Sequence, residues 1–114
     1  MANHKLERIE SDIIKYLSNI LLTETRDELL KTVTLTEVEV NKDLSRALVY
    51  FTSISELTHK EIEKEMNEAS PFLRGKLAKV LEIRNIPELK FIYDETIEYA
   101  TKIERIISNI HKED

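Results

Sequence analysis

The pair Ser70-Pro71 divides a long run of helix-forming residues into two parts. Proline disfavours helical geometry at the residue before it, whereas its fixed φ angle suits the first turn of a new helix. Serine is a favoured N-cap, so we expect Ser70 to accept a hydrogen bond from the start of the second helix. The pair therefore predicts two helices that meet at a kink, and it argues against one long helix.

The first of these two helices begins with a clear signal. Thr58-His-Lys-Glu61 matches a capping box, in which each side chain accepts a hydrogen bond from the other residue's backbone N–H. The helix should then run through Met66 toward Ala69. We expect the second helix over residues 71–83. Its buried side would consist of Leu73, Leu77, Val80 and Leu81.

Amphipathic patterns predict two more helices, one near each end of the chain. Residues 4–22 carry apolar side chains at steps of three and four, which builds one apolar stripe. The polar segment 23–31 that follows is a connection with room for a short helical turn. Asp94 can cap a last helix at about 95–111, whose apolar side is formed mainly by isoleucine.

Two segments rich in β-branched residues, 32–40 and 47–53, are expected to be strands. The polar residues 41–46 between them are typical of a turn, so the two strands predict an antiparallel hairpin. The alternation in the first strand is imperfect. Its apolar residues fall at odd-numbered positions in the first half and at even-numbered positions in the second half. A β-bulge would explain this change.

A third strand should open at Pro87, because apolar and polar or exposed positions alternate after it. Leu89, Phe91 and Tyr93 share one parity of this strand. The complete order is α–β–β–α–α–β–α, which indicates the α+β class: a three-stranded sheet with helices packed on one face. A chain of 114 residues fits one domain, here 1–114.

The composition narrows the classes of function. Without Cys, the chain has no disulfide, no thiolate metal site and no cysteine nucleophile. His4, His59 and His111 lie far apart, and no glycine loop could cradle a phosphate. No apolar run is long enough to span a membrane, and the charged N-terminus differs from a signal peptide. We expect a cytoplasmic monomer without metal, cofactor, small-molecule substrate or catalytic activity; a catalytic site assembled only in the fold is the alternative.

Positive charge is concentrated in one segment of this acidic chain. The net charge is −5, yet residues 69–93 hold five cations and two acids, a balance of 5 − 2 = +3. The cations are Arg74, Lys76, Lys79, Arg84 and Lys90. A basic face on an acidic protein can bind a polyanion such as RNA, so this segment is the first candidate for binding one.

The only glycine of the chain, Gly75, falls inside the second of the paired helices. On a helical wheel it lies with Ala78 and Glu82 opposite the apolar side, flanked by Arg74 and Lys79. Glycine in a helix interior costs roughly 1 kcal/mol relative to alanine. Close approach of a phosphodiester backbone would explain its presence, with the flanking cations neutralising phosphate. The alternatives are a tolerated surface glycine or a tight contact between helices.

The start of the same helix is a second candidate for phosphate binding. N–H groups near Phe72 and Leu73 lie at the positive end of the helix dipole, unless Ser70 satisfies them. Three other aromatic residues, Tyr50, Phe91 and Tyr93, could stack on bases, but their strand spacing is more typical of core residues.

The remaining charged residues allow two interpretations. Lys5 and Arg8 alternate with acids and Arg46 begins the second strand, so each is either an RNA contact or part of a solvated surface. Residues 54–70 balance to 2 − 5 = −3 and include the acidic side chains of the first paired helix. Such a face serves solubility or binds a basic protein, which makes a protein-interaction module the alternative function. The acids concerned are Glu61, Glu63, Glu65 and Glu68.

The chain resembles the ribosome-binding factor A family of bacterial ribosome assembly factors, whose element order is that of a type II KH domain. The matching pieces are 33–52, 68–96 and Arg8-Ile9. The most specific positions are Phe72-Leu73-Arg74, Arg84, Pro87-Glu88-Leu89, Phe91 and Asp94. Like the family, this chain lacks the Gly-x-x-Gly loop of ordinary KH domains.

Two features depart from the family pattern. The family's Ala-x-Gly kink reads Ala69-Ser70-Pro71 in this chain, and residues 111–114, HKED, do not resemble the family's often longer, basic tail. Because proline can still begin a helix, we expect the kink to be preserved. The resemblance implies binding to the immature small ribosomal subunit and its rRNA, support of late 16S rRNA maturation, and greatest importance at low temperature.

Overall fold

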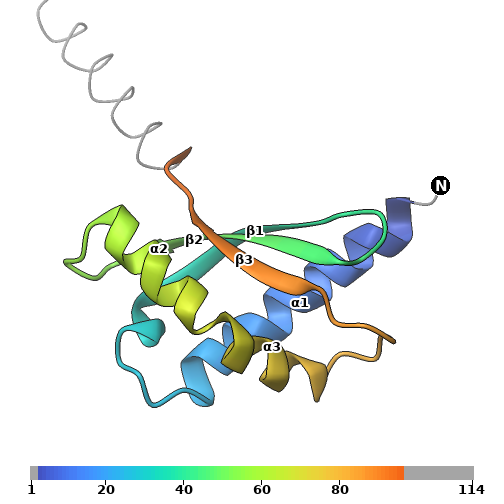
Figure 1. The fold of residues 1–114 in the computed structure, drawn as a ribbon, viewed down its shortest axis with the longest axis horizontal. Coiled ribbons are helices and arrows are strands. Elements are labelled where there is room, and N and C mark those ends of the chain that lie inside the picture. Colours follow the sequence, from blue (N-terminus) through green and yellow to red (C-terminus); the bar gives the residue numbers. More distant parts are fainter. Residues whose placement is uncertain (1–2, 97–114) are drawn as a thin grey trace, which may run out of the picture.

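A computed structural model of the chain describes residues 3–96 (Figure 1). In chain order its elements are α1 (Asn3–Thr23), the 3₁₀ helix η1 (Leu30–Thr32), β1 (Val33–Val40), β2 (Arg46–Ser53), α2 (His59–Glu68), α3 (Ser70–Ala78) and β3 (Glu88–Tyr93). The predicted order of helices and strands is confirmed over this range. The expected last helix, at about 95–111, lies almost wholly outside the described residues.

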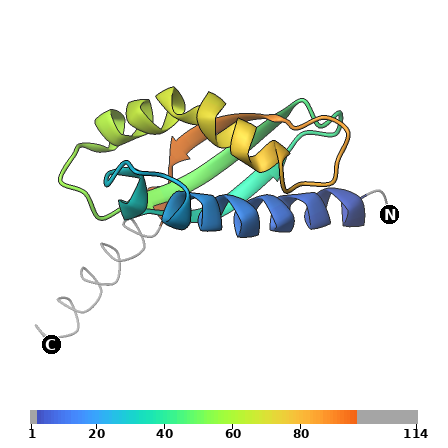
Figure 2. The ribbon, with the colours of Figure 1, turned by 90° about the horizontal axis from the view of Figure 1, so that it is seen from below.

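The three strands form one mixed sheet with the order β1-β2-β3. β2 pairs antiparallel with β1 in the predicted hairpin and parallel with β3. The crossover from β2 to β3 consists of α2 and α3. Figure 2 shows that all three α-helices cover the same face of the sheet, with α1 along one edge of that face and α2–α3 along the opposite edge. The predicted α+β fold with helices on one face is therefore confirmed.

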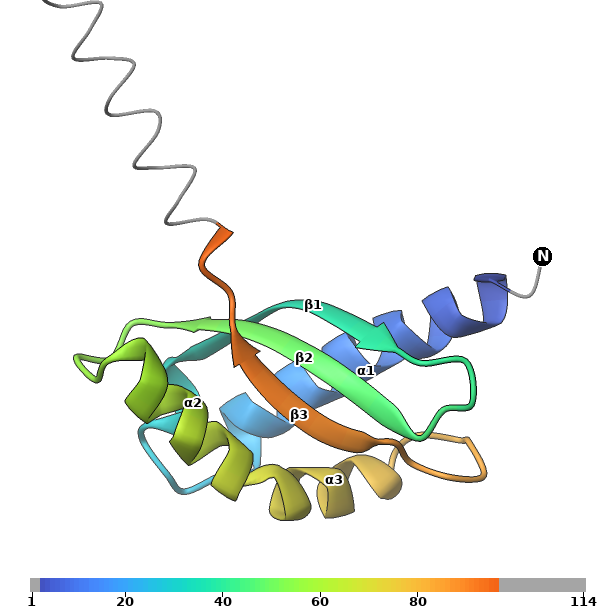
Figure 3. The same cartoon turned by 45° about the horizontal axis from the view of Figure 1, so that its top comes forward.

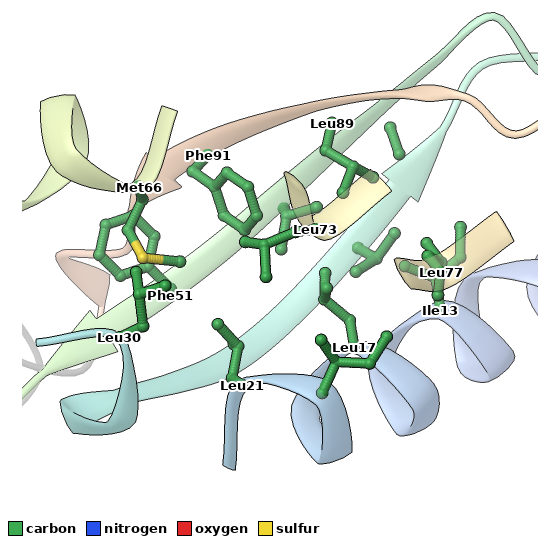
Figure 4. Packing of buried hydrophobic residues seen from close by; sticks show 14 of the residues in the cluster. Ile13, Leu17, Leu21, Leu30, Phe51, Met66, Leu73, Leu77, Leu89 and Phe91 are labelled. Atoms are coloured by element: carbon green, nitrogen blue, oxygen red, sulfur yellow. The ribbon is translucent and has the colours of Figure 1, made fainter. Parts of the chain in front are cut away.

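The core lies between this face and the helices (Figure 4). Alternate residues of β2 and β3 point into it, as their period of two requires. The ring of Phe51 meets those of Phe91 and Tyr93 edge to face, with centroids 6.3 and 5.3 Å apart. The buried residues that fill the core from the helices are Ile9, Ile13, Leu17, Ile20, Leu21, Ile62, Met66, Leu73 and Leu77.

A β-bulge accounts for the change of parity in the first strand. The register with β2 shifts between Leu35 and Glu37, which leaves Thr36 as the extra residue. The Thr36 hydroxyl donates a 2.6 Å hydrogen bond to Oδ2 of Asp94, just beyond β3. This bond, together with that from the Thr96 N–H, lowers the pKa of Asp94. The bulge thus ties the first strand of the sheet to the end of the last.

The predicted capping box at the start of α2 is confirmed. The Glu61 N–H donates to Oγ1 of Thr58 at 3.1 Å, and the Thr58 N–H donates to Oε1 of Glu61 at 3.4 Å. The break at the other end of α2 is short, because Ala69 alone separates the two helices. Pro71 has no N–H to donate to the carbonyl four residues earlier. Figure 3 shows the resulting change of direction between α2 and α3.

The prediction that Ser70 is the N-cap of the second helix was wrong. Ala69 occupies that position, and no side chain caps α3. The Ser70 hydroxyl instead donates a 2.6 Å hydrogen bond to the carbonyl of Leu89 in β3. The Leu89 carbonyl has no partner strand on this side, so it is an alternative hydrogen-bond partner for Ser70. The local sequence 68–72 does not indicate it.

The predicted end of the second helix was also wrong, because α3 stops at Ala78 and not at 83. The N–H groups of Lys79 and Val80 donate to carbonyls three residues earlier, which tightens the last turn and ends the helix. Val80, expected on the buried side, is consequently 41% exposed. Leu81 is buried as predicted, although it lies outside the helix.

Side chains of the paired helices satisfy the outer edge of β3. Asn67 accepts a hydrogen bond from the Phe91 N–H at 2.9 Å and donates one to the Phe91 carbonyl at 3.0 Å. Oε2 of Glu63 accepts from the Tyr93 N–H at 2.9 Å. With the contribution of Ser70, these bonds replace those of a neighbouring strand.

Candidate nucleic-acid interface

The predicted RNA-binding segment folds into a hollow between α3 and the connection that leads to β3. Its volume is about 390 Å³. It is lined by Pro71, Arg74, Gly75, Ala78, Arg84, Asn85 and Ile86. The structure therefore brings three of the predicted binding residues, Arg74, Gly75 and Arg84, to one concave surface, which we call the α3 groove.

Arg74 holds the far wall of the α3 groove in place. Its Nε and Nη2 atoms donate to the carbonyl of Ile86 at 3.1 and 2.6 Å. A guanidinium suits this task because two of its N–H groups can converge on one acceptor. Its charge still contributes to the groove, but the residue also positions the connection that carries Arg84.

Gly75 is exposed on the floor of the α3 groove. A Cβ added to it would meet no heavy atom within 4 Å. Within residues 3–96 no neighbouring helix therefore requires a glycine at this position, so a tight contact between helices of this range is excluded. The bare backbone at Gly75 leaves room for a ligand to approach α3 closely.

The other predicted cations differ in their surroundings. Lys79 and Arg84 are exposed and make no ion pair within residues 3–96. The ammonium of Lys76 lies 5.7 Å from the ring centroid of Phe72, a cation–π distance. Lys79 and Arg84 can therefore meet an anion without first breaking an ion pair.

One of the two N–H groups predicted to be free at the start of α3 is already hydrogen-bonded. The Leu73 N–H donates to the carbonyl of Ala69 at 3.0 Å, because the helical geometry continues through Ala69. The prediction of a phosphate held at Leu73 was therefore wrong. Glu82, expected beside Gly75 on the helical wheel, lies beyond the end of α3.

Three segments far apart in sequence meet at one end of the molecule, at the right of Figures 1 and 3. They are the start of α1, the β1–β2 turn and the connection before β3. Oε2 of Glu10 accepts from the Val40 N–H at 2.8 Å, and the Glu88 N–H donates to the carbonyl of Ser45 at 3.0 Å. The structure thus gathers the segments of Lys5, Arg8, Arg46 and Arg84 at this end.

Lys90 lies apart from the α3 groove. It alternates with the buried Leu89 and Phe91, so it points to the face of the sheet that carries no helix of the described range. It pairs in register with Leu48 of β2. On the same face, partial desolvation and then the nearby Glu39 and Glu37 raise the pKa of Tyr50.

The sequence suggested that the acidic side chains of α2 form one solvated face, but the structure gives them different surroundings. Glu61 takes part in the capping box and half-buried Glu63 accepts from the backbone of β3. Glu65 and Glu68 are exposed. Two of the four acids thus have a structural task, which reduces the acidic surface available to a basic partner.

Two classes of site find no support in the part of the chain that the structure describes. Residues 3–96 contain no group of three or more His, Asp or Glu side chains placed to hold a metal ion. No helix in this range is both long and apolar enough to cross a membrane.

Comparisons with known proteins identify the family. The family model described as ribosome-binding factor A matches residues 5–107. The chain belongs to this family. The ribosome-binding factor A of Staphylococcus epidermidis is 37% identical over an alignment that covers 100% of this chain and 99% of the relative.

Two sets of coordinates of ribosome-binding factor A from Thermus thermophilus, a crystal structure and a homology model fitted into a cryo-EM map, share the fold. The crystal structure has a TM-score of 0.68 and 23% identity, covering 77% of this chain and 94% of its own. Coordinates of the same Thermus factor, fitted into a cryo-EM map of its complex with the 30S subunit, have a TM-score of 0.63 and 23% identity. They cover 76% of this chain and 92% of their own. The predicted family membership and fold are therefore confirmed.

Proposed function

We propose that this protein is a ribosome assembly factor that binds the free, immature small ribosomal subunit through the α3 groove. Family membership and the 30S complex of the Thermus factor support the choice of partner. The observation that carries the proposal is the exposed backbone of Gly75 beside the exposed cations Lys79 and Arg84, which make no ion pair within residues 3–96. This arrangement suits a phosphodiester backbone, which needs close approach and positive charge but no specific hydrogen-bond pattern.

The mechanism is differential binding. By binding one conformation of the 16S rRNA more tightly than others, the factor shifts the population toward that conformation and supports late maturation. This requires no metal, nucleotide or catalytic group, and a cytoplasmic monomer suffices. The effect is largest at low temperature, when incorrectly folded rRNA rearranges slowly.

The test is cosedimentation with free small subunits, large subunits and assembled ribosomes over a series of salt concentrations. We expect binding to free small subunits alone, weakening steeply with salt because phosphate contacts release counterions. The double variant Lys79→Glu/Arg84→Glu should lose this binding and remain folded. Arg74 is unsuitable for charge reversal, because replacing it would also leave the Ile86 carbonyl without its hydrogen bonds from the guanidinium.

A matched control reverses two exposed cations on α2, Lys60→Glu and Lys64→Glu, with the same change in net charge. It should bind small subunits nearly as well as the unchanged protein. Equal losses in both double variants would mean that only net charge matters, and the groove would be the wrong site. Binding that persists in the groove variant but is lost on neutralising Glu65 and Glu68 would favour the alternative, a protein-interaction module.

A further inference from the structure

One large aromatic side chain on α3 is directed to solvent. Phe72 is 47% exposed, whereas Phe51 and Phe91 are completely buried and Tyr93 stacks on the ring of His59. Exposure of a single apolar residue is common and needs no explanation by itself. Phe72 does not line the α3 groove itself, but its position in α3 between Pro71 and Gly75, which do, gives its exposure a meaning.

Phe72 lies one helical turn before Gly75 on the surface of α3. Residues three and four apart are neighbours on a helix surface, so Phe72 adjoins Gly75 and Lys76, and Gly75 adjoins Lys79. Gly75 contributes no side chain, and nothing else lies within 4 Å of its Cβ direction. A flat ligand can therefore reach the ring by passing over Gly75.

Charge surrounds the same path. The ammonium of Lys76 lies 5.7 Å from the centroid of the Phe72 ring, on a flexible stem that can turn to a phosphate. The hollow across Gly75 carries Arg84 and the polar side chain of Asn85. An aromatic face with cations on either side is the combination that holds an unpaired nucleotide: the base stacks while the phosphates meet the cations.

We infer that Phe72 is a base-stacking residue, and that the α3 groove binds a single-stranded segment of RNA with one unpaired base on this ring. The inference rests on the proposed function and specifies its ligand. A regular duplex does not fit, because its bases are stacked on one another and expose no face to a side chain.

The test compares Phe72→Leu with Phe72→Trp in binding to free small subunits. Leucine keeps an apolar side chain without an aromatic face, so the affinity should fall roughly 10- to 100-fold, the scale of one lost base stack. The salt dependence should stay unchanged, because no phosphate contact is removed. Phe72→Trp should bind at least as tightly as the unchanged protein, and base stacking should quench its fluorescence.

Each outcome separates this inference from the proposed function. If the unchanged protein fails to bind small subunits, the proposed function is wrong. If it binds, and Phe72→Leu binds equally well with the same salt dependence, the stacking inference is wrong and the assembly function stands. Tight binding of both variants without quenching in Phe72→Trp would indicate an apolar contact with a ribosomal protein and would also overturn the inference. Circular dichroism and thermal unfolding check that both variants are folded.

Discussion

Helices α2 and α3 follow each other across a single residue, yet they direct their polar side chains differently. α2 begins with a capping box and presents Glu63 and Asn67 to the backbone of β3. α3 has no side-chain cap, and beyond its first residue its polar side chains lie at the surface around Gly75. The first helix holds a strand in place, and the second directs its polar side chains to solvent.

If the α3 groove binds the small subunit as proposed, this kinked pair separates stability from binding. Changes on α2 should act on unfolding and leave the affinity for the small subunit intact, whereas changes on α3 should act mainly on affinity. Arg74 is the exception, because its guanidinium both stabilises the connection to β3 and contributes charge to the α3 groove.

The largest expected effect is on α2, at Asn67. In Asn67→Leu the volume is kept, but the N–H and carbonyl of Phe91 lose their partners on the edge of β3. Leaving two such groups unsatisfied should lower the free energy of unfolding by about 2 to 4 kcal/mol. Urea unfolding measures this loss. The exposed neighbour Glu68→Ala is the control and should change stability by less than about 0.5 kcal/mol; equal effects would show that water replaces the amide.

Arg74→Lys tests the residue that contributes both to stability and to the charge of the α3 groove. Lysine keeps the charge but cannot converge two N–H groups on the Ile86 carbonyl, so stability should fall by about 1 to 2 kcal/mol. Amide hydrogen exchange should become faster in residues 79–87, and the affinity for small subunits should fall with it. Lys79→Arg, at a cation without a carbonyl partner, should change neither measurement. Unchanged exchange in Arg74→Lys would contradict its positioning role.

Thr58→Ala should affect stability alone. Loss of the N-cap hydrogen bond to the Glu61 N–H should cost about 1 kcal/mol of unfolding free energy. The affinity for small subunits should remain that of the unchanged protein, because α2 lies outside the α3 groove. A large loss of affinity in a folded variant would remove the separation between the two helices.

Gly75→Ala should move stability and binding in opposite directions. Alanine favours the helix and meets no neighbour, so the variant should be more stable by about 0.5 to 1 kcal/mol. The added methyl group should hinder close approach of a phosphate backbone and weaken binding several-fold. Thermal unfolding and cosedimentation on the same preparation measure both changes. A stabilised variant with undiminished binding would mean that Gly75 is only a tolerated surface glycine.

The smallest expected change in stability concerns the hydrogen bond between Thr36 in β1 and Asp94, just beyond β3. The folded pKa of Asp94 lies below its ordinary value of 3.8, so its bond with Thr36 stabilises the protein above that pH and is lost as the pH falls through the folded pKa. Thr36→Val should therefore lower stability by less than about 1 kcal/mol at pH 7, and the difference should shrink in strongly acidic solution. Urea unfolding of both proteins across this pH range measures it.

Features that depend on neighbouring residues in the sequence could be predicted. The capping box at Thr58, the hairpin, the bulge and the exposed position of Gly75 all follow from local patterns of side chains. The clustering of cations in the sequence also has a counterpart in the fold, because Arg74 of α3 and Arg84 of the following connection both line the α3 groove.

Features that depend on distant partners could not be predicted. Ser70 has the sequence context of an N-cap, but its acceptor is a strand carbonyl 19 residues later. The end of α3 at Ala78 follows from turn geometry that the apolar spacing through Leu81 conceals. The backbone of Phe72 was considered from the sequence but its ring was missed as a stacking candidate, although its distance of three residues from Gly75 makes the two neighbours on the helix surface.

The covered edge of β3 also has a consequence for the order in which the chain is made. β3 pairs with a strand about 40 residues earlier in parallel register, a kind of pairing that forms slowly and leaves strands open to aggregation. Synthesis from the N-terminus delivers Asn67 and Ser70 before β3, so the side chains that close its edge are present when the strand emerges. A nascent chain of this protein can therefore protect its last strand from neighbouring chains as soon as that strand joins the sheet.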